Sequence, residues 1–329
     1  MIRRASLLVM VLPWALAGTV WAASEEISDP EVAKADPDFA IQGEYLGEGV
    51  LPDGKQIKAG AQVIALGEGK FQIVYYEGGL PGAGWKPDDG KLEASGQREA
   101  DATAISSEDV KGKIVDGKMT ISDSEGNGHV EFQRVERKSP TLCQKPPEGA
   151  VVLFDGSGVD WFPGAHMSPD KNLISGTLSK AEFNSYRSHL EFRLSWMPEA
   201  RGQGRSNSGV YVHNCYEIQV LDSFGLEGLN NECGGVYSIK APDVNMCLPP
   251  LVWQTYDADF TAPKFDANGN KVSNARLTLC HNGVVIHDDL ELPHFNPGGQ
   301  EEGPGPRGIQ LQGHGCQVQY RNIWLEKKD

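Results

Sequence analysis

The chain has 329 residues, 39% hydrophobic and 23% charged, a composition that excludes a collagen, a coiled coil and a multi-span membrane protein. Its 30 Lys and Arg stand against 45 Asp and Glu, and the net charge of −15 disfavours binding to nucleic acid or to an anionic membrane. The 39 Gly and 20 Pro predict a turn-dense, β-rich protein, and the length allows two domains of roughly 150 residues.

The first 22 residues have the pattern of a secretory signal peptide. Arg3 and Arg4 precede an apolar run over residues 7–17, and Val20-Trp21-Ala22 supplies the small residues of a cleavage site. The apolar run is shorter than the roughly 20 residues that a membrane-spanning helix needs. We therefore expect cleavage after Ala22, no membrane span, and a mature protein that is periplasmic or secreted.

The next two segments differ in their patterning. Residues 23–38 are acidic and aperiodic, which predicts a disordered lead-in. Residues 39–138 contain short alternating runs, such as residues 129–135, between Gly-rich turns, and Asp116-Gly117 is a hairpin signal. This pattern predicts a small all-β accessory domain. It contains no motif for chemistry, and the role and protein partner of this domain stay open.

A Pro-rich linker over residues 139–148 separates this domain from a second one at 149–329. Asn282-Gly283, between two apolar runs, is the strongest hairpin signal of the chain. Many strands at turn-separated intervals without helices predict a two-sheet sandwich or jelly roll. Further strands are expected at Ala150–Phe154, Ser188–Leu194, Ser208–Val212, Tyr216–Leu221, Leu251–Phe260, Asn274–Cys280, Gly283–His287, Gly308–Leu311 and Gln317–Glu326.

The six cysteines all lie at or after Cys143, so any disulfides would join only the second half of the chain. An even number of cysteines in an exported chain favours disulfides, although six allow 15 pairings. We expect Cys233 and Cys247 to pair and to close a Gly-rich loop. The chain has no Cys-x-x-Cys pair and no Cys/His cluster with zinc spacing, so a structural zinc site is not expected.

One predicted strand carries the chemistry-bearing residues. Its period of two places Glu217 and Gln219 on one face, with Ile218 and Val220 on the other. Asp222 joins the polar face only if one residue between Gln219 and Asp222 is bulged. A carboxylate that faces inward is costly unless it is paired or lines a wet cleft, so the pattern favours a polar cleft. The alternative is a sheet face that is simply solvated.

In form, this strand resembles the Glu-x-Asp-x-x-Glu strand of laminarinase-like glycosidases, with Gln219 at the middle position and the shorter Asp222 at the last. Retaining hydrolysis needs two carboxyl groups about 5 Å apart across the scissile bond. Gln219 is neutral and Asp222 is shorter than a glutamate, so these two residues fit that mechanism poorly.

A broader resemblance covers residues 149–327. Its segments, in chain order, are Asn207–Tyr211, Tyr216–Ser223, Cys233–Tyr237, Pro249-Pro250, Trp253–Asp257, Ala275–Thr278 with His281–Val284, and Tyr320–Trp324. Together they resemble the 3-keto-disaccharide hydrolase family, which is also described as 3-keto-glucoside 1,2-lyases and 3-keto-2-hydroxyglucal hydratases. The resemblance implies a concanavalin A-like jelly roll, so we expect an all-β protein with a smaller N-terminal β-rich domain.

The resemblance also implies a reaction. A ketone at C3 of a glucoside makes the C2 proton acidic and places the C1–O bond β to the carbonyl. The site then needs a base near C2, hydrogen-bond donors for the developing C3 oxyanion and an acid for the leaving oxygen, but not two matched carboxylates. Gln219 fits such a site, because an amide donates well to a keto oxygen.

We expect three catalytic residues. Glu217 is the leading base, since a partly desolvated carboxylate has a raised pKa. Asp222 either shares that role or caps the turn that follows it. His314, between two glycines, is an acid or base, or else a loop residue without a role. The family often has an acidic residue before this histidine, and Gly313 stands there instead.

Further polar and aromatic residues are candidates for substrate binding, most with a plain structural alternative. The alternatives are a turn for Asn207, a solvated sheet face for Lys180 and Arg193, core packing for Trp253 and the surface for His281. The candidates are Gln219, Asn207, Arg205, Lys180, Arg193, Trp253 and His281.

The sequence thus predicts an exported enzyme that acts on a 3-keto sugar or another carbohydrate. A divalent metal could polarise the ketone, but no ligand spacing supports one, so no cofactor is expected. Two alternatives stay open. They are a laminarinase-like retaining glycoside hydrolase and a non-catalytic carbohydrate-binding protein.

Overall fold

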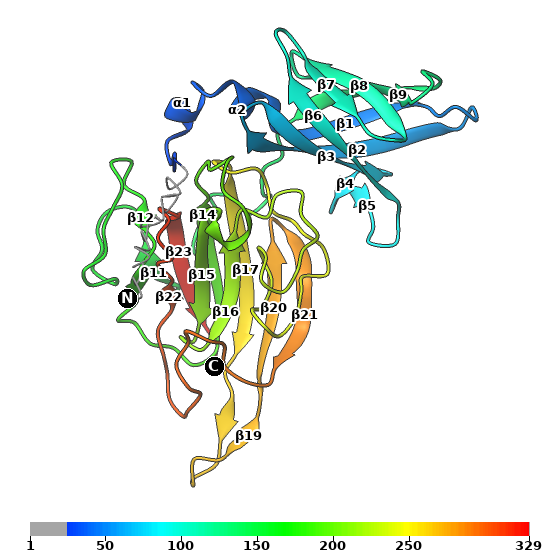
Figure 1. Cartoon of the computed structure of the whole chain (residues 1–329). Coiled ribbons are helices and arrows are strands. Elements are labelled where there is room, and N and C mark those ends of the chain that lie inside the picture. Colours follow the sequence, from blue (N-terminus) through cyan, green and yellow to red (C-terminus); the bar gives the residue numbers. More distant parts are fainter. Residues whose placement is uncertain (1–24, 329) are drawn as a thin grey trace, which may run out of the picture.

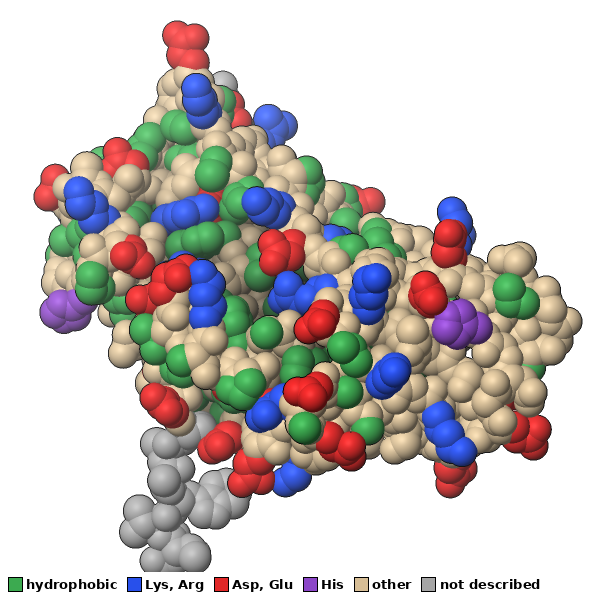
Figure 2. Space-filling view, turned by 90° about the horizontal axis from the view of Figure 1, so that it is seen from above, with side chains coloured by type: hydrophobic (Ala, Val, Ile, Leu, Met, Phe, Trp, Pro, Cys, Tyr) green, Lys and Arg blue, Asp and Glu red, His purple; other side chains and the backbone are tan. Residues whose placement is uncertain are grey.

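The computed structural model describes residues 25–328, which form a β-barrel followed by a β-sandwich (Figure 1). The predicted signal peptide, residues 1–22, lies outside the described residues. Within them, no helix has the length and apolar character needed to cross a membrane. Despite the net charge of −15, Figure 2 shows acidic and basic side chains interspersed over the face seen from above.

The N-terminal unit is a closed antiparallel barrel in the order β1-β10-β9-β8-β7-β6-β3-β2. Alternating side chains such as Tyr45, Ile73 and Phe132 point inward and form its core. Asp116 and Gly117 both have positive φ, as the predicted two-residue hairpin requires. The strands are β1 (Gly43–Val50), β2 (Gln56–Gly67), β3 (Lys70–Glu77), β6 (Lys91–Arg98), β7 (Thr103–Ser106), β8 (Val110–Val115), β9 (Lys118–Asp123) and β10 (His129–Val135), with the short pair β4 (Leu80–Pro81) and β5 (Gly84–Trp85) outside the barrel.

Two short helices, α1 (Pro30–Ala33) and α2 (Pro37–Ile41), occupy the segment predicted to be disordered. Asp29 and Asp36 cap them, since each side chain accepts a bond from the backbone N–H two residues later. Each helix has a proline in its first turn, where the missing N–H costs nothing. The prediction of a disordered lead-in is therefore wrong for the described part of this segment.

One end of the barrel is closed by Trp196, a residue of the sandwich. Its side chain is fully buried in the barrel core, together with Ala33 and Leu251. The Phe39 ring packs edge-on against it with centroids 5.2 Å apart, and the indole N–H donates to Asp36 at 2.9 Å. The barrel and the sandwich therefore share hydrophobic core, and Ile64 and Tyr76 of the barrel in turn belong to the core cluster of the sandwich.

The second unit is a sandwich of two antiparallel sheets, which confirms the all-β, jelly-roll-like prediction. The large sheet has the order β11-β23-β14-β17-β20-β21, with β12 also paired to β23, and the small sheet has the order β13-β22-β15-β16. The strands are β11 (Val151–Phe154), β12 (Leu173–Ile174), β13 (Thr177–Leu178), β14 (Tyr186–Arg193), β15 (Asn207–Val212), β16 (Tyr216–Leu221), β17 (Trp253–Thr261), β20 (Ala275–His281), β21 (Val284–Leu292), β22 (Gln310–Leu311) and β23 (Gln319–Lys327), and the hairpin β18 (Lys264–Phe265) with β19 (Lys271–Ser273) extends from the sandwich.

The core of the sandwich lies between the two sheets. Phe192 and Tyr256 face inward from the large sheet, and Ile218 faces inward from the small one. Asn282 and Gly283 both have positive φ, so the predicted hairpin between β20 and β21 is confirmed.

The six cysteines are free thiols. Cys233 and Cys247 lie within hydrogen-bonding contact of each other, both fully buried, as their predicted pairing requires. The sulfurs are not bonded, however, so the predicted disulfide is absent from the structure.

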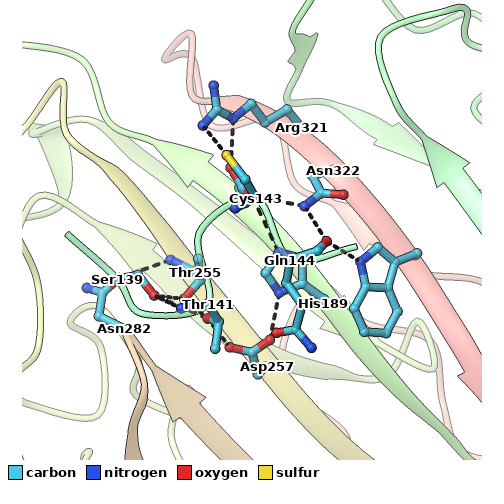
Figure 3. Close-up of polar contacts among 12 residues, drawn as sticks. Ser139, Thr141, Cys143, Gln144, His189, Thr255, Asp257, Asn282, Arg321 and Asn322 are labelled. Carbon is cyan, nitrogen blue, oxygen red and sulfur yellow. Dashed lines mark hydrogen bonds and ion pairs between the residues drawn. The ribbon is translucent and has the colours of Figure 1, made fainter. Parts of the chain in front are cut away.

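The predicted linker crosses the outer face of the large sheet (Figure 3). Thr141 donates to Asp257 at 2.6 Å, and the backbone N–H of Cys143 donates to Glu191, also at 2.6 Å. The Gln144 carbonyl accepts from the side chain of Asn322 at 3.0 Å. These contacts attach the linker to three strands, so it is part of the second domain and not a free tether.

Replacing Trp196 by alanine should lower the free energy of unfolding by about 3–5 kcal/mol, because it empties a fully buried site at the end of the barrel. Denaturant unfolding would measure this loss. Val272→Ala is the control, since Val272 is 62% exposed, and it should change stability by less than about 0.5 kcal/mol. Equal stabilities of the two variants would contradict the shared core.

Candidate functional site

The outer face of the small sheet gathers polar side chains from β15 and β16. In their antiparallel register Tyr211 stands opposite Glu217, and Gly209 stands opposite Gln219. Val210, Ile218 and Val220 point into the core instead. Glu217 and Gln219 therefore share one face, as the alternation predicts, and that face also carries Asn207, Gly209 and Tyr211.

Gly209 makes room for the Glu217 carboxyl group. A Cβ atom at position 209 would lie 2.3 Å from Glu217 Oε1, closer than any real contact. Glu217 is only 3% exposed, and its carboxyl group lies beside the Tyr211 hydroxyl. Burial raises the pKa of Glu217 to about 7, although the bond from Tyr211 opposes this. The carboxyl group can thus hold or release a proton near neutral pH.

A loop segment lies over this carboxyl group and fixes its strand. Asn296 accepts from the Glu217 backbone N–H at 2.6 Å and donates to the Tyr237 carbonyl. The Tyr211 hydroxyl donates to the Pro297 carbonyl at 2.9 Å and accepts from Gln312 at 3.2 Å. Tyr211 is therefore held by two partners next to Glu217.

Amide side chains surround the neighbouring part of this face. Gln203, in the short helix η1 (Gly202–Gly204), accepts at Oε1 from Asn207 at 3.2 Å and from Gln219 at 3.1 Å. Gln219 also donates to the Asn231 carbonyl at 3.3 Å. Asn207 Oδ1 is buried without a partner among the described residues, which leaves one acceptor free. The other polar atoms of Asn207 and Gln219 are bonded within the protein, and the two side chains are 1% and 2% exposed.

Asp222 does not join this face. The register of β15 and β16 runs regularly to Leu221, so the bulge that we expected before Asp222 is absent. Asp222 instead forms a buried ion pair with Arg205 at 2.6 Å. Arg205 also donates to the Ala65 carbonyl of the barrel at 3.3 Å. The catalytic role expected for Asp222 and the substrate contact expected for Arg205 therefore need correction, because the two side chains bind each other. Asp222 also accepts from the Phe224 backbone N–H at 3.4 Å, which agrees with the alternative that it caps the turn that follows it.

His314 and Lys180 are both exposed. His314 lies in the loop after β22 and forms no hydrogen bond with the part of the chain that the structure describes. The Lys180 ammonium lies 5.6 Å above the Trp161 ring. The structure does not link either side chain to Glu217 through a contact, so their roles stay predictions.

Arg193 and Trp253 lie on a different sheet from Glu217, paired across β14 and β17 of the large sheet. The guanidinium groups of Arg321 and Arg193 lie 3.9 and 4.9 Å from the Trp253 ring centroid. Trp253 also borders a cavity of about 590 Å³ between barrel and sandwich, which Glu217 does not line. The prediction that these two residues act beside Glu217 is therefore wrong, because they belong to the opposite sheet.

His281 is a core residue and not a surface one. It is fully buried between the rings of Phe192 and Tyr256, and its Nε2 lies 3.0 Å from Gln254 Oε1. Burial lowers the pKa of His281 to about 3, so it stays neutral. Its predicted contact with substrate is wrong, because the alternation of β20 turns it into the core.

A second polar cluster, on the outer face of the large sheet, was not predicted from the sequence (Figure 3). His189 Nδ1 lies 2.6 Å from Asp257, and Arg321 donates to Glu191 at 2.7 Å. Burial alone would raise the pKa of Glu191, but hydrogen bonds from His189, Asn322 and Arg321 hold it at about 2. The linker covers this cluster and uses its ionised groups as anchors. Over the described residues, no group of three or more His, Cys, Asp or Glu is arranged to hold a metal ion.

Sequence reasoning also missed Tyr211 and Gln203 as site residues. Tyr211 had a usable signal, because the alternation of its strand places it on the face of Asn207. Gln203 gave none, since a loop has no period from which its direction can be read.

A buried, proton-exchanging carboxyl group among amides on a β-sandwich is suited to an enzyme that acts on carbohydrate. The profile of the 3-keto-alpha-glucoside-1,2-lyase-like domain family matches residues 144–326. The chain belongs to this family, and the resemblance drawn from its sequence is confirmed.

A comparison with solved structures found similar proteins. A Parabacteroides distasonis protein provisionally named a glycosyl hydrolase is 26% identical, with a TM-score of 0.50 over 55% of this chain and 85% of the other. A second protein of that organism with the same description is 15% identical, with a TM-score of 0.39 over 55% and 95%. A search of curated proteins found no significant match.

Gly209→Ala should displace the Glu217 carboxyl group, since the added methyl group would lie 2.3 Å from Oε1. We expect a loss of about 1–3 kcal/mol of stability from overpacking, measured by denaturant unfolding. Gly158→Ala is the matched control, because a Cβ there meets nothing within 4 Å. Equal effects of the two substitutions would show that Gly209 does not make room for the carboxyl group.

Glu217→Gln should stabilise the protein at pH 8 but not at pH 4. The pKa of Glu217 is raised from about 4.5 to about 7 in the folded state. The stabilisation from its protonated carboxyl group is therefore full below pH 4.5 and is lost as the pH rises through 7. The buried charge then costs up to about 3 kcal/mol, which glutamine avoids. Unfolding at both pH values measures this, with exposed Glu182→Gln as the control. A gain of the same size at both pH values would contradict the assigned pKa.

Proposed function

We propose that this chain is an exported enzyme that cleaves 3-keto-glucosides, or hydrates the resulting glucal, by removing the proton at C2. The observation that carries the proposal is the buried Glu217 carboxyl group with a pKa of about 7, beside Tyr211. A base works best when its pKa lies near the working pH, because it is then ionised and still a good proton acceptor. Membership of the lyase-like family supports the substrate class.

In the proposed reaction, Glu217 accepts the C2 proton, and the C–H electrons form a C2–C3 double bond with negative charge on the C3 oxygen. As the C3 carbonyl re-forms, a C1–C2 double bond develops and the C1–O bond breaks. The leaving oxygen takes a proton. Water can then add across C1–C2, with hydroxyl at C1 and hydrogen at C2, and the sum of the steps is hydrolysis.

The neighbouring groups fit the other two roles. The single proton of the Tyr211 hydroxyl is donated to the Pro297 carbonyl in this structure, and if the hydroxyl turned toward the substrate it would donate to an oxygen that becomes negative. The Asn207 side-chain oxygen, which lacks a partner in the described residues, would accept from a sugar hydroxyl, whereas the Gln219 amide, which donates to Gln203 and Asn231, would first have to leave them. His314 remains a candidate acid for the leaving oxygen, and His314→Asn tests it as a loss of kcat.

The environment of Asp222 argues against the laminarinase-like alternative. That mechanism needs a second carboxyl group about 5 Å from the first and free to act. Asp222, which the resemblance would place in that role, is held in a buried ion pair by Arg205. Elimination requires no second carboxylate, so it fits the arrangement better than double displacement does.

The experiment incubates the full chain with a glucoside and, separately, with its 3-keto derivative. We expect aglycone release only from the keto sugar, with solvent deuterium incorporated at C2. Cleavage of the plain glucoside would favour the hydrolase, and binding without turnover would favour a carbohydrate-binding protein.

Activity should depend on the ionisation of Glu217. Since the base must be deprotonated, kcat/KM should rise with pH through about 7 and level off above it. Glu217→Gln should lower kcat/KM by at least about a hundredfold and remove this rise, whereas exposed Glu182→Gln should match the wild type. A Glu217→Gln enzyme with wild-type activity and pH profile would refute the assignment.

A further inference from the structure

The barrel has one closed end and one hollow end. Trp196 closes the first, near the end of β2, where the Ala65 carbonyl meets Arg205 of the sandwich. At the opposite end of the same strand, Ile57 and Ala59 line a cavity of about 270 Å³. The barrel is therefore a cup, closed by the sandwich and hollow at the far end.

The cup is lined by apolar side chains that continue the barrel core. Ile57 and Ile121 are partly buried against that core. The deeper wall includes the rings of Tyr75 and Phe132, whose centroids are 5.8 Å apart. Val110 and Leu92 complete the apolar wall. Water binds weakly in such a space, because most of the lining is apolar and the Tyr75 and Tyr76 hydroxyls are bonded to Met119 and Gln62.

Strand β1 contributes little to the barrel core beyond Tyr45. Tyr45 faces inward, and the alternation makes Gly47 and Gly49 the next inward positions. No side chain enters the barrel from this part of the strand. A methyl group at position 47 would lie 2.6 Å from the Phe132 ring, so Phe132 fills the space beside Gly47 and itself forms part of the wall of the cup.

The charged residues at the rim are already engaged. Lys91 lies 3.2 Å from Glu227 of the sandwich and 5.0 Å above the Trp85 ring. Glu77, also at the rim, pairs with Lys55 at 2.9 Å. The mouth therefore offers no unpaired charge to an ionic ligand, and an apolar lining favours a neutral one.

We propose that the barrel binds one small neutral molecule with an aromatic or short alkyl body in this cup. An apolar cavity of roughly 150 Å³ can hold benzene, so the larger cup has room for a bigger ring system. Eight-stranded barrels are wide enough to enclose one small ligand. The proposal does not depend on the reaction assigned to Glu217, which lies in the sandwich.

The test is a fluorescence titration of the full chain with N-phenyl-1-naphthylamine, a neutral aromatic probe. We expect saturable binding of one probe per chain. Ala59 lines the cup and is 6% exposed, so Ala59→Phe would place a ring inside the cup. This variant should raise Kd at least tenfold. Leu46→Phe is the matched control, because it adds the same ring to the outer side of β1, where Leu46 is 40% exposed, and Kd should not change.

Circular dichroism and sedimentation accompany the titration. If Ala59→Phe fails to fold, Ile121→Trp fills the same space from β9 and should have the same effect. Absence of saturable binding, or equal Kd values in the folded filled variants and the wild type, overturns the proposal. A wild-type dimer that Ala59→Phe dissociates also overturns it, since the occupant would then be a second copy of this chain.

Discussion

The candidate site depends on keeping one carboxyl group out of water, and the space for it comes from a neighbouring position of the next strand that carries no side chain. Gly209 supplies that position, and any larger residue would meet the Glu217 oxygen at 2.3 Å. Burial then gives the carboxyl group a pKa of about 7. Tyr211 lies beside it, held by the Pro297 carbonyl and the Gln312 amide. The reactivity of the face thus follows from local packing, and the neighbouring amides supply polarity without a competing charge.

The contact between the domains is built into the same part of the sandwich. Arg205 precedes β15 by two residues, neutralises Asp222 at the end of β16 and reaches a barrel carbonyl. Trp196, on the segment that leads into η1, fills the barrel end. Because η1 carries Gln203, which bonds both Asn207 and Gln219, the barrel supports the loop that orders the amides. Displacing the barrel would therefore disturb the position of Gln203 and the amides it bonds, although the barrel contributes none of the site's side chains.

The sequence predicted those features that depend on local rules. Period-two alternation placed Glu217 and Gln219 on one face, and the Asn-Gly and Asp-Gly pairs predicted hairpins that exist. Prediction from the sequence failed where the environment of a side chain depends on which other elements cover its face of the sheet. Alternation cannot tell that His281 points between two sheets, or that Trp253 borders the barrel. Gln203 and the linker contacts were missed for the same reason, because irregular segments have no period and their partners are distant in sequence. The expected bulge before Asp222 failed because pairing with Arg205 satisfies that carboxylate without one.

The strap formed by residues 139–144 bears on where the second domain begins. The family match starts at residue 144, yet Ser139, Thr141 and Cys143 already bond to β14 and β17. A fragment cut at the family boundary would uncover Glu191 and His189, both fully buried here, and would expose these polar side chains to solvent. An expression fragment of the sandwich should therefore start before residue 139, so that the sheet keeps its cover.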